Sequence, residues 1–84
     1  LQGLQVSAYA LPDGAHIEMA PHREGPPKWA VRQNGSCLNR EGRWEWEPQP
    51  SSRDDYFLRR CRWDTPAQAY GAWEKTQLAP RPNR

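Results

Sequence analysis

The sequence offers little material for a hydrophobic core. Only 36% of its 84 residues are hydrophobic, and no apolar run approaches the roughly twenty residues that a membrane-spanning helix needs. Nine prolines interrupt the chain, so part of it is expected to lie outside any packed core. A chain of this length forms at most one domain. We therefore expect no membrane span and a single small core.

Catalytic and metal-binding groups are equally scarce. Neither His16 and His22 nor Cys37 and Cys61 are spaced like metal ligands, and no glycine-rich phosphate loop is present. Two cysteines do not make a disulfide framework, and we expect them to be small buried side chains of a reduced protein. A cysteine activated by a distant histidine remains the alternative. The expectation is a protein without metal, cofactor or enzymatic activity.

Two glutamates are the remaining catalytic candidates. Glu45 and Glu47 lie on one face of the same expected strand, as a pair of catalytic carboxylates can. Glutamates that alternate with tryptophans are also typical of a half-exposed strand, and we favour that interpretation.

The charge is nearly balanced. Twelve basic and ten acidic residues give a formal net charge of +2. This excess is too small to indicate a nucleic-acid partner by itself.

What the sequence does contain is tryptophan, and four of its five tryptophans fall within 28–63. We therefore expect one domain over 28–78. Residues 1–27 are expected to form a flexible arm or a weak hairpin around Pro12-Asp13-Gly14, followed by a proline-rich linker. Residues 79–84 are expected to be a disordered tail.

Alternation and turn residues predict the strands. Residues 28–33 alternate, and Asn34-Gly35 is a strong hairpin signal that predicts a return strand over 36–39. Residues 43–48 alternate more clearly, with Trp44 and Trp46 on one face. Residues 57–63 are interpreted as a further strand.

Capping residues predict the helices. Ser52 fits the N-cap of a helical turn, with Asp54 and Asp55 in its first turn. Thr65, Pro66 and Gln68 make a stronger start signal for a helix that follows. Its expected buried stripe is Ala69, Tyr70 and Trp73. The predicted fold is α+β: a small antiparallel sheet of three to four strands, packed by one C-terminal helix.

A set of arginines is the first candidate binding surface. It comprises Arg32, Arg43, Arg53, Arg60 and Arg62. On an uncovered sheet face they would form a cationic platform for nucleic acid. Pairing with Glu45 and Glu47 across strands would instead give a solvated lattice of ion pairs, which we favour. Arg53 is expected to pin the loop before it to the sheet through one of these glutamates.

The tryptophans are the second candidate surface. Five exceed what one helix on a small sheet needs, so one or two of them can stay exposed. The alternative, which the sequence supports equally, is that all five are core or are covered by the proline-rich arm. Exposed tryptophan beside arginine is typical of the residues that contribute most to protein–protein binding. Trp44 and Trp46 are the candidates.

Several segments resemble a pattern found in small proteins of bacteriophages and prophages. They are Trp29-Ala30-Val31, Gly42-Arg43-Trp44-Glu45-Trp46-Glu47-Pro48, Pro50-Ser51-Ser52-Arg53, and Thr65 with Ala69. The resemblance covers about 28–74 and implies a phage or prophage source and the cytoplasm of a bacterial host cell, but no activity. In topology alone, three strands before a helix are also similar to the sheet-type DNA-binding domains of plant ethylene-response factors.

The resulting expectation is a small accessory protein that is not an enzyme and that binds a macromolecule. The expected partner is a host or phage protein. The alternative partner is a nucleic acid bound by the arginine-rich sheet face.

Overall fold

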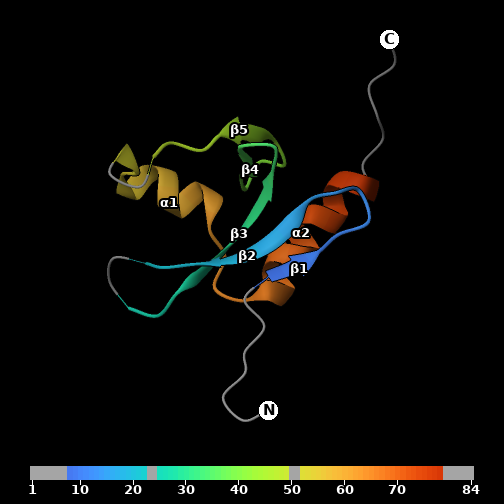
Figure 1. Ribbon diagram of the computed structural model, residues 1–84, viewed down its shortest axis with the longest axis horizontal. Helices are drawn as coiled ribbons and strands as arrows, with labels where there is room; N and C mark the ends of the chain where they lie inside the picture. The colour runs from blue at the N-terminus through green and yellow to red at the C-terminus, as the bar shows by residue number, and fades with distance from the viewer. Residues whose placement is uncertain (1–7, 23–24, 50–51, 79–84) are drawn as a thin grey trace.

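The computed structural model of the protein describes residues 8–22, 25–49 and 52–78 and shows one antiparallel sheet with two helices (Figure 1). The strands are β1 (Ala8–Ala10), β2 (His16–Ala20), β3 (Lys28–Gln33), β4 (Ser36–Leu38) and β5 (Trp44–Trp46). The helices are α1 (Asp55–Cys61) and α2 (Pro66–Leu78). The strands neighbour each other in chain order, so β1 and β5 are the sheet edges. The predicted α+β class is confirmed, but the sheet has five strands and a second helix is present.

The N-terminal segment contributes two of these strands. Residues 8–20 form the hairpin rather than an arm, with Gly14 at φ 93° and the Asp13 carboxylate accepting from the Ala15 amide at 3.0 Å. β2 then pairs with β3 at five positions, from His16↔Arg32 to Ala20↔Lys28. The folded unit therefore begins well before residue 28. Residues 1–7 of the expected arm and the expected tail at 79–84 lie outside the described residues.

The central hairpins form as their turn residues predict. Asn34 and Gly35 both have positive φ, 52° and 81°, which is the backbone of a type I′ turn. In the next turn, the Asn39 side chain accepts from the amides of Glu41 and Arg43 at 2.9 and 3.1 Å. Asn39 is almost fully buried, so this side chain fixes the path from β4 into β5.

The predicted strand over 57–63 is wrong, because residues 55–61 form α1. Asp54, not Ser52, is the N-cap, and its carboxylate accepts from the Phe57 amide at 2.8 Å. Phe57 and Cys61 are four residues apart and share the buried side of the helix. Positions 57 and 61 also coincide in a two-residue repeat, so alternation alone could not separate helix from strand.

The extended backbone predicted for that segment is kept only at its last two residues, Arg62, with φ −136° and ψ 149°, and Trp63. The amide and carbonyl of Trp63 exchange hydrogen bonds of 2.8 and 2.7 Å with Trp29. The described β4 pairs only with the C-terminal part of β3, so Trp63 occupies the place beside Trp29 that β4 does not reach.

Helix α2 begins as predicted. The Thr65 hydroxyl accepts from the Gln68 amide at 3.1 Å, while the Gln68 side chain accepts from the Asp64 amide rather than completing the box at Thr65. Ala69 and Trp73 are buried, but Tyr70 is 44% exposed and does not belong to the buried stripe.

The two helices lie on opposite faces of the sheet. On one face, α2 packs through Ala69 and Trp73 against Ile17 and Val31. On the other face, α1 packs through Phe57 and Cys61 against Cys37 of β4. The register places Trp44 and Trp46 on the α2 face and Glu45 on the α1 face, as the alternation predicts. Helix α2 covers β2 and β3. Trp44 and Trp46 are correspondingly exposed on β5.

Candidate functional site

Glu47 is the centre of the arginine cluster that the sequence singles out. Its Oε2 accepts from Arg32 and Arg62 at 2.7 Å each and lies 2.9 Å from the Arg53 guanidinium. Arg32 comes from β3, Arg62 from the residue after α1, and Arg53 from the segment before α1. One carboxylate therefore ties β3 to both ends of that helix.

The side chain of Glu47 is largely covered and only 7% exposed. Burial raises its pKa, but hydrogen bonds and charge from Arg32 and Arg62 outweigh this effect and hold the pKa at about 2. Arg53 also donates its Nε to the Pro48 carbonyl at 2.9 Å. The prediction that Arg53 pins this loop to the sheet is confirmed.

A second pair lies beside this cluster. Arg60 donates to Glu45, which also accepts from the Asn39 amide group at 2.8 Å. The Arg60 guanidinium lies 4.4 Å from the centre of the exposed Tyr56 ring. Of the five candidate arginines, four therefore pair with carboxylates. Arg43 is exposed, and its side chain has no hydrogen bond or ion pair within the described part of the chain.

The two tryptophans of β5 are the exposed apolar groups of the sheet edge. Trp46 is 74% exposed and Trp44 is 37% exposed. The Asn39 amide donates to the Arg43 carbonyl, and the Glu47 amide donates to the Gly35 carbonyl, at 2.8 and 3.1 Å. Hydrogen-bonded and non-bonded positions alternate in an antiparallel ladder, so the N–H and C=O groups of Trp44 and Trp46 point away from β4, outward from the β5 edge of the sheet.

Trp46 also lies against the turn between β3 and β4. A Cβ atom at Gly35 would come within 2.8 Å of the Trp46 ring, so this turn accepts only glycine without moving the indole. Beside the ring is a depression of about 250 Å³, lined by Arg32, Gly35, Ser36, Trp46, Glu47 and Arg53. An aromatic wall, a hydroxyl and two arginines thus share one small hollow.

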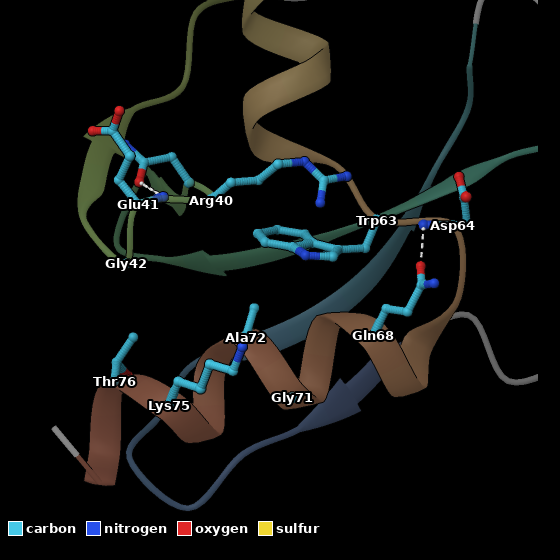
Figure 2. Close-up of a pocket in the computed structure, with 11 residues that line it drawn as sticks. Arg40, Glu41, Gly42, Trp63, Asp64, Gln68, Gly71, Ala72, Lys75 and Thr76 are labelled. Carbon is cyan, nitrogen blue, oxygen red and sulfur yellow. Dashed lines mark hydrogen bonds between the residues drawn. The ribbon is translucent and has the colours of Figure 1, made fainter.

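A larger groove of about 700 Å³ separates α2 from the turn at 40–42 (Figure 2). Trp63 forms its floor, and the Arg40 guanidinium lies over that ring at 5.4 Å from its centre. Arg40 also donates to the carbonyls of Arg59 and Arg62 at 2.7 Å each. These hydrogen bonds show that Arg40 caps the C-terminal end of α1. Trp63 itself is only 5% exposed, so little of its ring is accessible from the groove.

Sequence reasoning missed this groove. Gly71 and Ala72 of α2 form one wall, and nothing lies within 4 Å of a Cβ built at Gly71. The small residues Gly71 and Ala72 of α2 were the one signal in the sequence, and small residues on a helix do not reveal which segment lies opposite them.

The two cysteines lie together in the small core under α1. Both are fully buried, and a hydrogen bond between the thiols, with burial, raises the pKa of Cys61. Neither thiol is a nucleophile accessible to a substrate. In the residues that the structure describes, no group of three or more histidine, cysteine, aspartate or glutamate side chains could hold a metal ion.

None of the described helices is long and apolar enough to cross a membrane. Comparison with family models, with curated proteins and with solved structures finds no match. The function must therefore be argued from the site alone.

Proposed function

We propose that this chain is a non-enzymatic accessory protein that binds another protein through β5 and its two tryptophans. The observation that carries this proposal is the exposure of Trp46, 74%, on a strand whose outer backbone groups face away from the sheet. A large exposed indole is costly in an isolated protein and is typical of the residues that contribute most to protein binding.

Protein binding is favoured over nucleic-acid binding by the arrangement of the arginines. Arg32, Arg53 and Arg62 converge on Glu47, and Arg60 pairs with Glu45. These groups hold the fold together instead of presenting an open cationic face to a phosphate backbone. The phage or prophage origin and the cytoplasmic setting rest on the motif resemblance over 28–74 alone.

The test compares Trp46→Ala with Leu78→Ala. Leu78 is 76% exposed at the end of α2, so its truncation removes a similarly exposed apolar side chain elsewhere. The immobilised wild-type chain is used to capture proteins from a lysate of its source cells. A stoichiometric partner should bind the wild type and Leu78→Ala, and be weakened about thirtyfold by Trp46→Ala, which corresponds to roughly 2 kcal/mol.

Equal capture by folded Trp46→Ala and by the wild type would refute the proposal. A mixed-sequence DNA duplex is the second probe. Duplex binding that persists at physiological salt and is unaffected by Trp46→Ala would favour the nucleic-acid alternative instead.

A further inference from the structure

A further hollow lies apart from the strand edge of the proposed function. This basic pocket of about 450 Å³ has a lining that includes His22, Lys28, Arg40, Leu58, Arg59 and Asp64. It opens between the first residue of β3, the C-terminal half of α1 and the turn at 40–42. No residue of β5 lines it, so its ligand is a separate question from the partner of Trp44 and Trp46.

The backbone fixes the positions of Lys28 and Asp64 in this pocket. Trp29 and Trp63 exchange hydrogen bonds of 2.7 and 2.8 Å, and Lys28 and Asp64 are their neighbours in the chain. The Lys28 ammonium group and the Asp64 carboxylate form an ion pair beside this bridge. The pocket thus holds one carboxylate and one cation at a place that the main chain defines.

Arg40 brings a second cation to the same place. Its guanidinium donates to the carbonyls of Arg59 and Arg62 at 2.7 Å each. Figure 2 shows this guanidinium extending over Trp63 towards Asp64. A guanidinium has five N–H groups, so these two hydrogen bonds leave three of them available to a ligand.

Arg59 provides a third cation. It is exposed in the last turn of α1, and its side chain has no hydrogen bond or ion pair within the residues that the structure describes. Arg62 also lines the pocket, but its guanidinium donates to Glu47 and to the Cys61 carbonyl and is not counted here. The remaining charged groups are three cations and one carboxylate, an excess of two positive charges.

Asp64 does not neutralise the cations around it. A hydrogen bond and the charge of Lys28 lower the pKa of Asp64, and the charges of Arg40 and His22 lower it further. An added group with two negative charges would balance the excess. Donors from three different elements also suit the several oxygens of a phosphate better than the two oxygens of a carboxylate.

We infer that the basic pocket binds a phosphate group with two negative charges, held by Lys28, Arg40 and Arg59. The half-buried Leu58 side chain offers apolar surface to an organic substituent, and the volume lies in the range of small-molecule pockets, about 300–1,000 Å³. Asp64 opposes binding, because it repels the phosphate and competes for Lys28. This site goes beyond the proposed function and does not depend on it.

The probe is phenyl phosphate at about pH 7.5, where a phosphate monoester with a second pKa of about 6 carries two charges. Its methyl ester keeps the ring and the phosphate but carries one charge. Binding is followed at physiological salt by amide NMR shifts of the labelled protein. Saturable shifts are expected at residues 28, 40–41, 58–59 and 64, with a Kd of about 1 mM or lower. The methyl ester should bind about tenfold more weakly.

Inorganic phosphate distinguishes the two sources of this chemistry. Tighter binding of phenyl phosphate than of inorganic phosphate would identify an organic phosphate ester as the ligand. Equal affinity would identify free phosphate. Both results support the site.

Two variants locate the recognition. Arg59→Gln should weaken phenyl phosphate binding about tenfold, as loss of a charge-assisted hydrogen bond requires. Arg43→Gln is the matched control, because Arg43 is also exposed and does not line the pocket, and it should change the affinity less than twofold. Asp64→Asn should strengthen binding about fivefold, because it removes a negative charge and releases Lys28. A purely structural role of Asp64 would not produce tighter binding.

Four results would overturn the inference. They are shifts that vanish at physiological salt, equal binding of phenyl phosphate and its methyl ester, an equal effect of Arg43→Gln and Arg59→Gln, and unchanged or weaker binding by Asp64→Asn. Trp46→Ala should leave phosphate binding unchanged, so the basic pocket and the tryptophan edge are tested separately.

Discussion

Replacing the Glu47 carboxylate by an amide is expected to destabilise the fold more than any other single charge change. Glu47→Gln keeps the side-chain shape but leaves Arg32, Arg53 and Arg62 facing one another around a neutral group. The pKa of Glu47 lies at about 2 instead of 4.5, and each pKa unit corresponds to about 1.36 kcal/mol of differential interaction. The charged form thus contributes about 3 kcal/mol, similar to the cost of breaking a buried ion pair.

Thermal and urea unfolding measure this loss. For a chain of this size, about 3 kcal/mol corresponds to a fall in Tm of roughly 12–24 °C. Glu18→Gln is the matched control, because Arg32 is the one ion-pair partner of Glu18 among the described residues and the Glu18 side chain is 37% exposed. That exposed pair should contribute less than about 1 kcal/mol.

The pH dependence provides an independent measurement of the same quantity. The pKa of Glu47 is depressed in the folded state, so its contribution is fully present above pH 4.5 and is lost as pH falls towards about 2. The wild type should lose about 3 kcal/mol more than Glu47→Gln over that interval. Equal unfolding midpoints for the Glu47 and Glu18 variants, with parallel pH profiles, would refute the argument that this carboxylate holds the sheet to both ends of α1.

Three further substitutions test other parts of the structure. Asn39→Ala should lower the free energy of unfolding in urea by about 2–3 kcal/mol, because it removes a buried side chain that accepts hydrogen bonds from two turn amides and donates one to a carboxylate. A loss under about 0.5 kcal/mol would contradict that role. Gly71→Ala should raise stability by about 1 kcal/mol, since it favours the helix and its Cβ meets no neighbour; a fall in Tm would show that the groove is filled in solution. Gly35→Ala should lower the free energy of unfolding by about 1 kcal/mol or more, because residue 35 has a positive φ. The added Cβ should also displace the indole of Trp46 and shift the maximum of its fluorescence. An unchanged spectrum would contradict the packing of that ring on the turn.

The candidate site combines local features that the sequence predicts with contacts that it does not. The structure shows the predicted pairing of Glu45 and Glu47 with arginines, but Arg32 alone of these partners lies on a strand, because Arg60 belongs to α1. The Glu47 side chain is only 7% exposed, so the pairs are not the solvated lattice that was expected. That three arginines meet on Glu47 was not predictable, because Arg32, Arg53 and Arg62 come from different elements. The nucleic-acid surface was predicted from the same arginines on the assumption that α1 was a strand.

The sequence by itself determined the features that depend on a few adjacent residues. Asn34-Gly35 specifies its turn because both residues adopt positive φ, and the alternation of Trp44, Glu45 and Trp46 separates their two faces. Thr65 starts α2 through a hydrogen bond that spans only three residues.

Only the tertiary structure decided what the rest of the chain packs against. Residues 57–63 fit either period, and burial of Phe57 and Cys61 against Cys37 selects the helix. The exposure of Trp46 depends on α2 covering β2 and β3 rather than β5, which no local pattern records. Burial and ion pairing depend on residues distant in the chain, and those contacts produce the open aromatic edge and the charged hollow beside it.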